Sequence, residues 1–274
     1  MVKKLIYYID YLYLNEYKIK MMKKILLISF TLIVFSNFIN AQIVTDRPDV
    51  TESSSVIPKN SFQIESGMIC QKSGEANFNP IIISAPSTLF RYAPSKYFEI
   101  RLISQYQNYI SFNPSDFPNI ASGFNDIELG TKIQLFRNET SNTEIAFLTH
   151  LSVPTGTSGL SNDYASINKI AVSHGVTDYL GIGYNLGYRY DFNGLSTLLY
   201  SLSIGYSIND KFGFYVEPYG DITEFNDHLI NINGGLVIKV KDNLQADFAF
   251  GTGINHIMNF YAIGFGWNIA RNKE

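Results

Sequence analysis

Apolar and polar residues alternate along most of the chain after residue 60. In residues 181–191 the bulky set is Ile182, Tyr184, Leu186, Tyr188 and Tyr190, and the intervening set holds glycine, asparagine and charge. A period of two predicts a β-strand with two different faces. A soluble sandwich would turn the bulky face to a core, whereas a membrane barrel turns it to lipid and the small, polar face to the lumen. This stretch alone fits either architecture.

The same alternation predicts twelve strands. They span residues 61–71, 80–92, 97–109, 125–136, 144–153, 166–172, 181–191, 197–208, 211–222, 228–240, 243–253 and 259–270, with 166–172 short and weak. Most have about ten residues, which is enough to cross a bilayer at a steep tilt. An even count lets the end strands meet and removes free edges.

The connections also alternate. Short ones at 93–96, 209–210 and 241–242 contrast with longer polar ones at 110–124 and 154–165. Outer-membrane barrels show this asymmetry, with short periplasmic turns and longer outer loops. We therefore predict an all-β, closed antiparallel transmembrane β-barrel of about twelve strands over residues 61–271, with a soluble sandwich as the alternative.

Composition narrows the function classes. Residues 1–41 hold six of the 21 basic and two of the 24 acidic residues, so the remainder has a formal charge of about -7. That remainder has no basic tract, which argues against a nucleic-acid partner. The single cysteine, Cys70, excludes an internal disulfide, and the four histidines show no metal-ligand spacing. We predict no metal and no cofactor.

The first 41 residues have the features of an export leader. Met21 and Met22 precede two lysines, an apolar run over 25–36 and a small residue at Ala41. This order is typical of a signal peptide, and the run is too short to span a bilayer comfortably as a helix. We predict a signal peptide over 21–41 cut after Ala41, and a start at Met21 or Met22 that leaves 1–20 as a mis-assigned extension. An uncleaved N-terminal anchor is the alternative.

Residues 42–60 predict irregular chain, because two prolines stand among serine, threonine and aspartate. The segment carries Asp46, Arg47, Asp49 and Glu52 within a short span. Two interpretations stay open: a solvated periplasmic tail, or a segment folded into the barrel, where Arg47 pairs with carboxylates.

Several motifs resemble one outer-membrane family. The N-terminal motif consists of Thr45, Asp46, Arg47, Pro48, Asp49, Thr51 and Glu52. It is followed in order by Leu89-Phe90-Arg91-Tyr92, Leu129-Gly130-Thr131-Lys132, Val153-Pro154-Thr155-Gly156 and Val216-Glu217-Pro218-Tyr219-Gly220. Together they resemble the transporter-like family labelled "putative MetA-pathway of phenol degradation". The chain departs from the expected pattern at Pro218 and Ala246, and neither change threatens the fold.

Charged residues on the polar strand faces are the candidate lumen-lining set. They are Glu65, Arg91, Glu99, Arg101, Asp126, Glu128, Lys132, Arg189, Asp191, Glu217 and Asp247. They would either select solute in a polar channel or form paired charges that fill a narrow lumen. A twelve-stranded barrel is intermediate in width, which favours a narrow, gated or plugged pore over an open porin.

The expected function is an outer-membrane channel or transporter in a Gram-negative cell, for passive uptake of a small solute, hydrophobic or aromatic. Its expected partners are outer-membrane lipid, the solute and the barrel-assembly machinery. Residues 264–269 resemble the C-terminal strand signal that this machinery recognises. One alternative is a non-conducting structural or ligand-binding barrel. Another is an outer-membrane lipid hydrolase, but His150 with Ser152, and Ser173 with His174, do not resemble the hydrolase motif. We therefore predict no enzyme and no catalytic residue.

Overall fold

The computed structural model describes residues 43–74, 80–111, 119–138 and 140–270, and within them it is all β. The strands are β1 (Ser61–Gly74), β2 (Ile81–Ser95), β3 (Phe98–Ser111), β4 (Asn119–Phe124), β5 (Ile127–Asn138), β6 (Thr143–Val153), β7 (Ala165–Gly175), β8 (Leu180–Asp191), β9 (Ser196–Ser207), β10 (Phe212–Thr223), β11 (Asp227–Lys241), β12 (Leu244–Gly253) and β13 (Ile257–Ala270). The described part contains no helix of the length and apolarity needed to cross a membrane. The predicted leader, its cleavage bond, the extension 1–20 and Arg271 lie outside the described residues.

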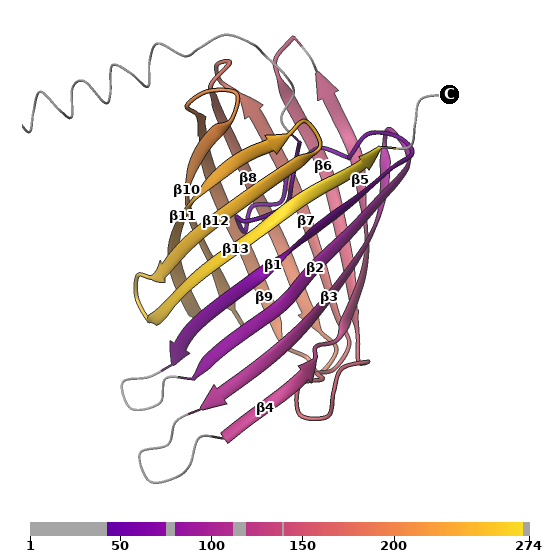
Figure 1. The fold of residues 1–274 in the computed structure, drawn as a ribbon. Helices are drawn as coiled ribbons and strands as arrows, with labels where there is room; N and C mark the ends of the chain where they lie inside the picture. Colours follow the sequence, from indigo (N-terminus) through magenta and orange to yellow (C-terminus); the bar gives the residue numbers. More distant parts are fainter. Residues whose placement is uncertain (1–42, 75–79, 112–118, 139, 271–274) are drawn as a thin grey trace, which may run out of the picture.

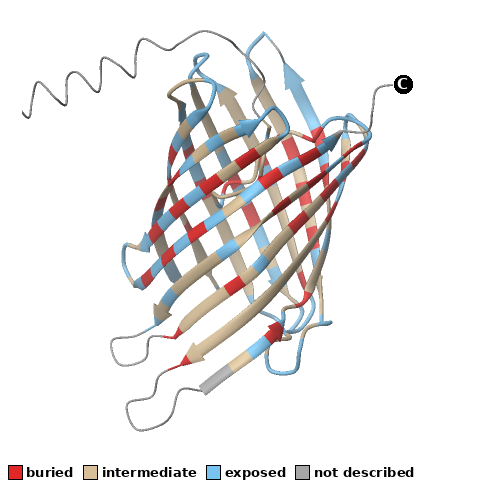
Figure 2. Cartoon of the chain, in the orientation of Figure 1, coloured by how far each residue is buried: buried red, intermediate tan, exposed pale blue. Residues whose placement is uncertain are grey.

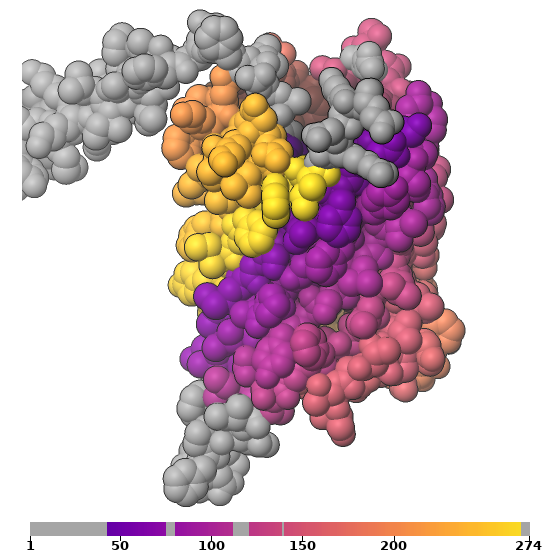
Figure 3. All heavy atoms as spheres, turned by 45° about the vertical axis from the view of Figure 1, so that its right-hand side comes forward, coloured from indigo at the N-terminus to yellow at the C-terminus, as the bar shows by residue number. Residues whose placement is uncertain are grey.

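The strands close into a ring (Figure 1). Each strand pairs antiparallel with its neighbours, and β1 pairs with both β2 and β13. Figure 3 shows this closure on the outer surface, where yellow β13 lies beside indigo β1. Both β4 and β5 pair with β3, so together they act as one barrel strand. The prediction of a closed barrel of twelve strands is confirmed.

Two predicted details were wrong. Residues 110–124 were expected to form a loop, yet β3 continues to Ser111 and β4 occupies Asn119–Phe124. The weak strand at 166–172 is a full strand, β7, from Ala165 to Gly175. Its pairing with β6 and β8 along the whole length supplies the stability that its own sequence pattern does not indicate.

The fourth barrel strand is interrupted at Asn125 and Asp126, where the β6–β7 connection docks. Asp126 Oδ1 accepts hydrogen bonds from the backbone N–H of Thr155 (3.0 Å) and Gly156 (2.9 Å). The Ser161 hydroxyl (2.6 Å) and the Asn162 N–H (2.7 Å) also donate to the Asp126 carboxylate. The loop thereby fills the break in the wall.

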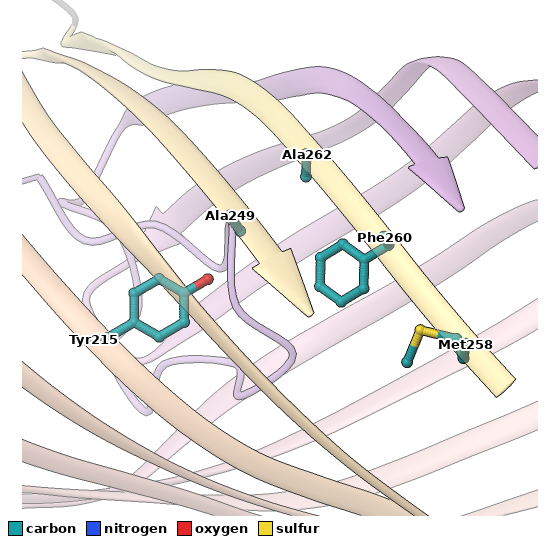
Figure 4. Packing of buried hydrophobic residues seen from close by; sticks show 5 residues of the cluster. All are labelled: Tyr215, Ala249, Met258, Phe260 and Ala262. Carbon is teal, nitrogen blue, oxygen red and sulfur yellow. The ribbon is translucent and has the colours of Figure 1, made fainter. Parts of the chain in front are cut away.

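Buried and exposed residues alternate along the strands (Figure 2), and the two sets differ in polarity. Outward side chains are bulky and exposed, such as Tyr261 at 62% and Leu186 at 58%, whereas inward Glu65 and Glu217 are 0% exposed. A soluble protein buries apolar side chains and exposes charged ones. This barrel has the reverse arrangement, which suits a surface in contact with lipid. A small apolar cluster also lies inside, formed by Tyr215, Ala249, Met258, Phe260 and Ala262 (Figure 4).

Pro218 fits the barrel because the sheet yields locally. Proline has no backbone N–H to donate to a neighbouring strand. Pairing between β9 and β10 is missing at Glu217 and Pro218, while Pro218 still lies opposite Ile232 of β11. The departure from the expected motif therefore costs one local stretch of ladder and leaves the closure intact.

Candidate functional site

Residues 43–57, hereafter the N-terminal segment, lie inside the barrel and contact its inner wall. Figure 1 shows the segment as an indigo loop enclosed by the strands, towards the end where β13 finishes. Hydrogen bonds join it to side chains of β1, β2, β3, β5, β8, β9 and β10. The segment therefore spans the lumen between opposite walls.

Asp46 is the centre of the contacts on one wall. Its Oδ2 lies 2.5 Å from Arg101 Nη1, 2.9 Å from Lys132 Nζ and 3.5 Å from Arg91 Nη1. Burial alone would raise the pKa of Asp46, but the attraction of Arg91, Lys132 and Arg101 outweighs it and holds the pKa well below its usual range. The carboxylate is therefore ionised and held by three cations from β2, β3 and β5.

Two acidic residues of the wall complete this cluster. Arg91 donates to Glu99 Oε1 through Nε at 2.7 Å and to Glu65 Oε1 through Nη1 at 2.7 Å. Glu65 also accepts the backbone N–H of Asp46 at 2.8 Å. All these side chains are almost fully buried, so each charge depends on its partners.

Glu52 forms a second ionic anchor. Its two oxygens lie 2.7 Å from Arg101 Nη2 and 2.7 Å from Lys169 Nζ of β7. Burial acts to raise the pKa of Glu52, but Lys169 and Arg101 lower it well below the ordinary value. Glu52 thus attaches the segment to β3 and to β7 at once.

The opposite wall holds the tip of the segment by hydrogen bonds. Glu217 accepts the backbone N–H of Val50 at 2.9 Å and of Thr51 at 2.5 Å. The Thr51 hydroxyl donates to Ser201 at 2.8 Å. Asn185 accepts the N–H of Glu52 at 2.7 Å and donates to its carbonyl at 2.9 Å.

Glycines on β1 and β13 let the segment approach the wall closely. A Cβ added to Gly264 would lie 2.7 Å from Arg47 Nη2, and one added to Gly67 would lie 2.5 Å from the same atom. A Cβ on Gly266 would meet Thr45 Cγ2 at 2.4 Å. No side chain fits at these three positions without displacing the segment.

Two charges of the segment have weaker partners. Arg47 Nη2 lies 3.7 Å from Asp247 Oδ1, so the expected pairing of Arg47 with a carboxylate is a loose one. Asp49 accepts a hydrogen bond from the Ser203 hydroxyl at 3.2 Å. Burial raises the pKa of Asp49 well above its usual range, and repulsion by Glu217 adds to the effect.

The structure brings together most of the predicted lumen set. Glu65, Arg91, Glu99, Arg101 and Lys132 surround Asp46, while Glu217 and Asp247 contact the segment elsewhere.

The remaining four members of that set lie apart. Glu128 is near His150, with 3.6 Å between Oε2 and Nδ1. Arg189 and Asp191 pair with each other at 2.7 Å. Asp126 holds the 155–162 loop, as described above, and no ion pair joins it to the other candidates among the described residues. Asp126 was assigned to the lumen set because it lay on the polar side of a predicted continuous strand. It lies instead in the break between β4 and β5, where that alternation does not apply.

The serine and histidine pairs considered for hydrolysis are engaged with other groups. His150 Nε2 accepts from Arg101 Nε at 3.0 Å, and no hydrogen bond joins it to Ser152 in the described structure. Ser173 bonds to Ser54, and His174 to Thr143. Among the described residues, no group of three or more His, Cys, Asp or Glu side chains could hold a metal ion.

Several polar residues of the site were missed at the level of sequence. Lys169, Asn185, Ser201 and Ser203 all contact the segment, yet only charged residues of well-defined strands were considered. Asn185, Ser201 and Ser203 stand on the polar side of the alternation. Their position on the polar side could have identified them as lumen residues, but it does not indicate which groups they contact.

The chain belongs to the family described as "Putative MetA-pathway of phenol degradation", whose model matches residues 45–266. The resemblance drawn from the motifs is thus confirmed. The match includes the N-terminal segment from Thr45 onwards as well as the barrel. Comparison with curated protein sequences gave no significant match.

Solved structures share the fold at low identity. An outer-membrane channel from Pseudomonas putida F1 matches with a TM-score of 0.66 and 10% identity, covering 79% of this chain and 98% of that one. The CymD monoaromatic hydrocarbon channel matches with 0.49 and 10%, over 79% and 90%. The KdgM porin in complex with disordered oligogalacturonate matches with 0.48 and 14%, over 75% and 98%. The first of these shows that the fold is that of an outer-membrane β-barrel.

Proposed function

We propose that this protein is an outer-membrane channel for passive uptake of a small solute, hydrophobic or aromatic, and that the N-terminal segment is its constriction. The observation that carries the proposal is the attachment of the segment to two opposite walls of a closed barrel, through Asp46 on one side and Thr51 on the other. A barrel needs no such cross-lumen segment to satisfy its own backbone, because the strand ladders already do so.

The chemistry of the attachment supports a constriction that can move. The contacts are mainly ion pairs and hydrogen bonds, and within the described residues a single buried apolar cluster includes segment residues, formed by Val56, Ile57 and Ala93. Polar contacts can be exchanged for water in a wet lumen, since their net stabilisation is modest. The name of the Pseudomonas putida F1 protein, an outer-membrane channel, points to the same role.

The proposal includes the route to the membrane. Residues 21–41 would direct export and be cut after Ala41, and the barrel-assembly machinery would insert the strands among outer-membrane lipids. The apolar outer face formed by side chains such as Leu186 and Tyr261 supports contact with lipid. No enzymatic activity is part of the proposal.

Single-channel conductance in planar bilayers tests the function. The refolded mature chain is compared with a chain lacking residues 42–60, after both are shown to be folded by heat-modifiable migration on gels. We expect discrete steps that grow larger in the shortened chain. Silence from both proteins, each verified as inserted, would favour the alternative of a structural or ligand-binding barrel.

A further inference from the structure

The lumen beside the N-terminal segment has free space on the side of β8, β9 and β10. A cavity of about 410 Å³ lies there, and Gly181 and Gly205 are among the small residues of its wall. The side of β2, β3 and β5 is instead filled by Arg91, Arg101 and Lys132, which are at most 2% exposed. Room for a passing solute therefore exists on the β8–β10 side.

The tip of the segment at Val50 and Thr51 closes this side. A Cβ added to Gly183 would lie 3.5 Å from Thr51 Cγ2, and the Thr51 hydroxyl donates to Ser201 at 2.8 Å. Glu217 accepts the backbone N–H groups of both tip residues. Movement of the tip would open the passage and would also remove two donors from the Glu217 carboxylate.

Ion pairing divides the carboxylates around the segment into two groups. Asp49 and Glu217 form no ion pair with a lysine or arginine among the described residues, and their partners are hydroxyl, amide and backbone N–H groups. Arg47 Nη2 lies against Gly67 and Gly264 on the β1–β13 side and is not paired with Asp49. The other carboxylates all pair with an arginine or lysine: Asp46, Glu52, Glu65, Glu99, Glu144 and Asp247.

The two carboxylates without a cation lie close together. The register between β9 and β10 places Glu217 next to Ser203, within the interrupted stretch of their ladder. The Ser203 hydroxyl donates to Asp49 at 3.2 Å, and Asp49 is repelled by Glu217. One uncompensated acidic group from the segment and one from the wall therefore meet at the same passage.

We propose that the passage beside the tip selects cations over anions, and that Glu217 and Asp49 are the selecting groups. Acidic side chains at a narrow point favour cations in channels. Movement of the tip and entry of water expose both charges to a passing solute. Neutral and cationic solutes are admitted, and anionic ones are opposed. The inference rests on the proposed function, in which the segment is a constriction that moves.

The reversal potential of single channels under a KCl gradient tests this selectivity. Glu217→Gln and Asp49→Asn each remove one charge at nearly constant size. Glu224→Gln, in the exposed turn between β10 and β11, is the matched control. The reversal potential does not depend on how often a channel opens, so it separates selectivity from any effect of a variant on attachment of the tip.

We expect the unaltered mature chain and Glu224→Gln to prefer K⁺ over Cl⁻ by on the order of tenfold, which is the scale of a unit charge close to an ion in water. Glu217→Gln and Asp49→Asn should each lower this ratio by about threefold, and the double variant should bring it near unity. A ratio near unity in the unaltered chain, or an undiminished ratio in the double variant, would overturn the proposal.

The chain lacking residues 42–60 gives a second readout. Without Asp46 and Glu52, the wall cations Arg101 and Lys169 lose ion-pair partners, so we expect the preference to shift towards Cl⁻. An unchanged K⁺ preference in that chain would also count against the proposal. Silence of every chain, each verified as inserted, would contradict the proposed function together with this inference, whereas steps without cation preference contradict this inference alone.

Discussion

The carboxylate of Asp46 lies 2.5 Å from the guanidinium of Arg101, although 55 residues separate the two in the chain. One residue belongs to the irregular N-terminal segment and the other to the inner wall at β3. This pair, together with Lys132 and Arg91, fixes one end of the segment within the lumen. The position of this end of the segment is thus set by ion pairs.

Replacement of the central carboxylate should release that end of the segment. In Asp46→Asn three buried cations lose their shared anion, and removal of one partner from a buried ionic cluster typically costs about 3–5 kcal/mol. We expect faster hydrogen exchange at the backbone N–H of residue 46, which donates to Glu65, and larger conductance steps. Asp191→Asn, which alters a half-buried pair away from the segment, is the control and should change neither. Unchanged exchange in Asp46→Asn would contradict the anchoring role.

Asp49 should make attachment of the tip weaker as pH rises. Its pKa is raised by burial and by Glu217, so the attached state favours the protonated carboxyl. A group of this kind stabilises attachment below its raised pKa, and that contribution is lost as pH increases from about 4, the value of a free Asp, through the raised value.

Asp49→Asn should remove this dependence, since a neutral amide replaces the carboxyl at the same size. We expect the conductance of the unaltered channel to grow with pH above the value of a free Asp, and that of Asp49→Asn to stay lower and flatter. A titration in planar bilayers measures both. Parallel curves for the two proteins would show that Asp49 does not titrate in the attached state.

Substitution by alanine should weaken attachment of the segment at one glycine and leave it unchanged at another. Gly264→Ala places a methyl group within 2.7 Å of both Arg47 Nη2 and the Ser66 carbonyl oxygen, which should cost about 1–3 kcal/mol of attachment. Gly205→Ala meets nothing within 4 Å and should leave attachment unchanged. Hydrogen exchange at the Asp46 N–H, which bonds to Glu65, reports the difference. Equal effects of the two substitutions would refute the close approach at Gly264.

Asp126 should anchor the connection between β6 and β7. In Asp126→Ala the loop loses all four hydrogen bonds from Thr155, Gly156, Ser161 and Asn162. We expect limited proteolysis to cut within residues 155–162 at least tenfold faster, since about 1.4 kcal/mol of lost local stability corresponds to that factor. Asp163→Ala serves as the control. Resistance of the Asp126→Ala loop to proteolysis would contradict its role as the anchor.

Alternation was sufficient to predict the barrel, because each strand must turn opposite faces to lipid and lumen. It also placed Glu65, Arg91, Glu99 and Lys132 on one side of their strands. It did not predict β4, since the break at Asn125 and Asp126 interrupts the period on which the method depends. Asp126 was consequently grouped with lumen residues that it does not join.

The contacts of the N-terminal segment could not be predicted from the sequence. Four charges in a short span indicated pairing, and Arg47 was the expected partner of acidic groups. In the structure Asp46 and Glu52 make the shorter ion pairs, with Arg101 and Lys169. These cations lie 49 or more residues further along the chain, and their proximity depends on closure of the ring. Local patterns carry no information on such distant partners.

A reversible crosslink tests the constriction most directly. The Thr51 and Ser201 hydroxyl oxygens lie 2.8 Å apart, so the double variant Thr51→Cys, Ser201→Cys, with Cys70→Ala to remove the native thiol, can form a disulfide that fixes the tip to β9. Single-channel conductance is recorded before and after reduction. We predict small or absent steps while the disulfide is intact and larger, frequent steps once it is reduced. Identical conductance in both states would contradict the claim that the N-terminal segment constricts this channel.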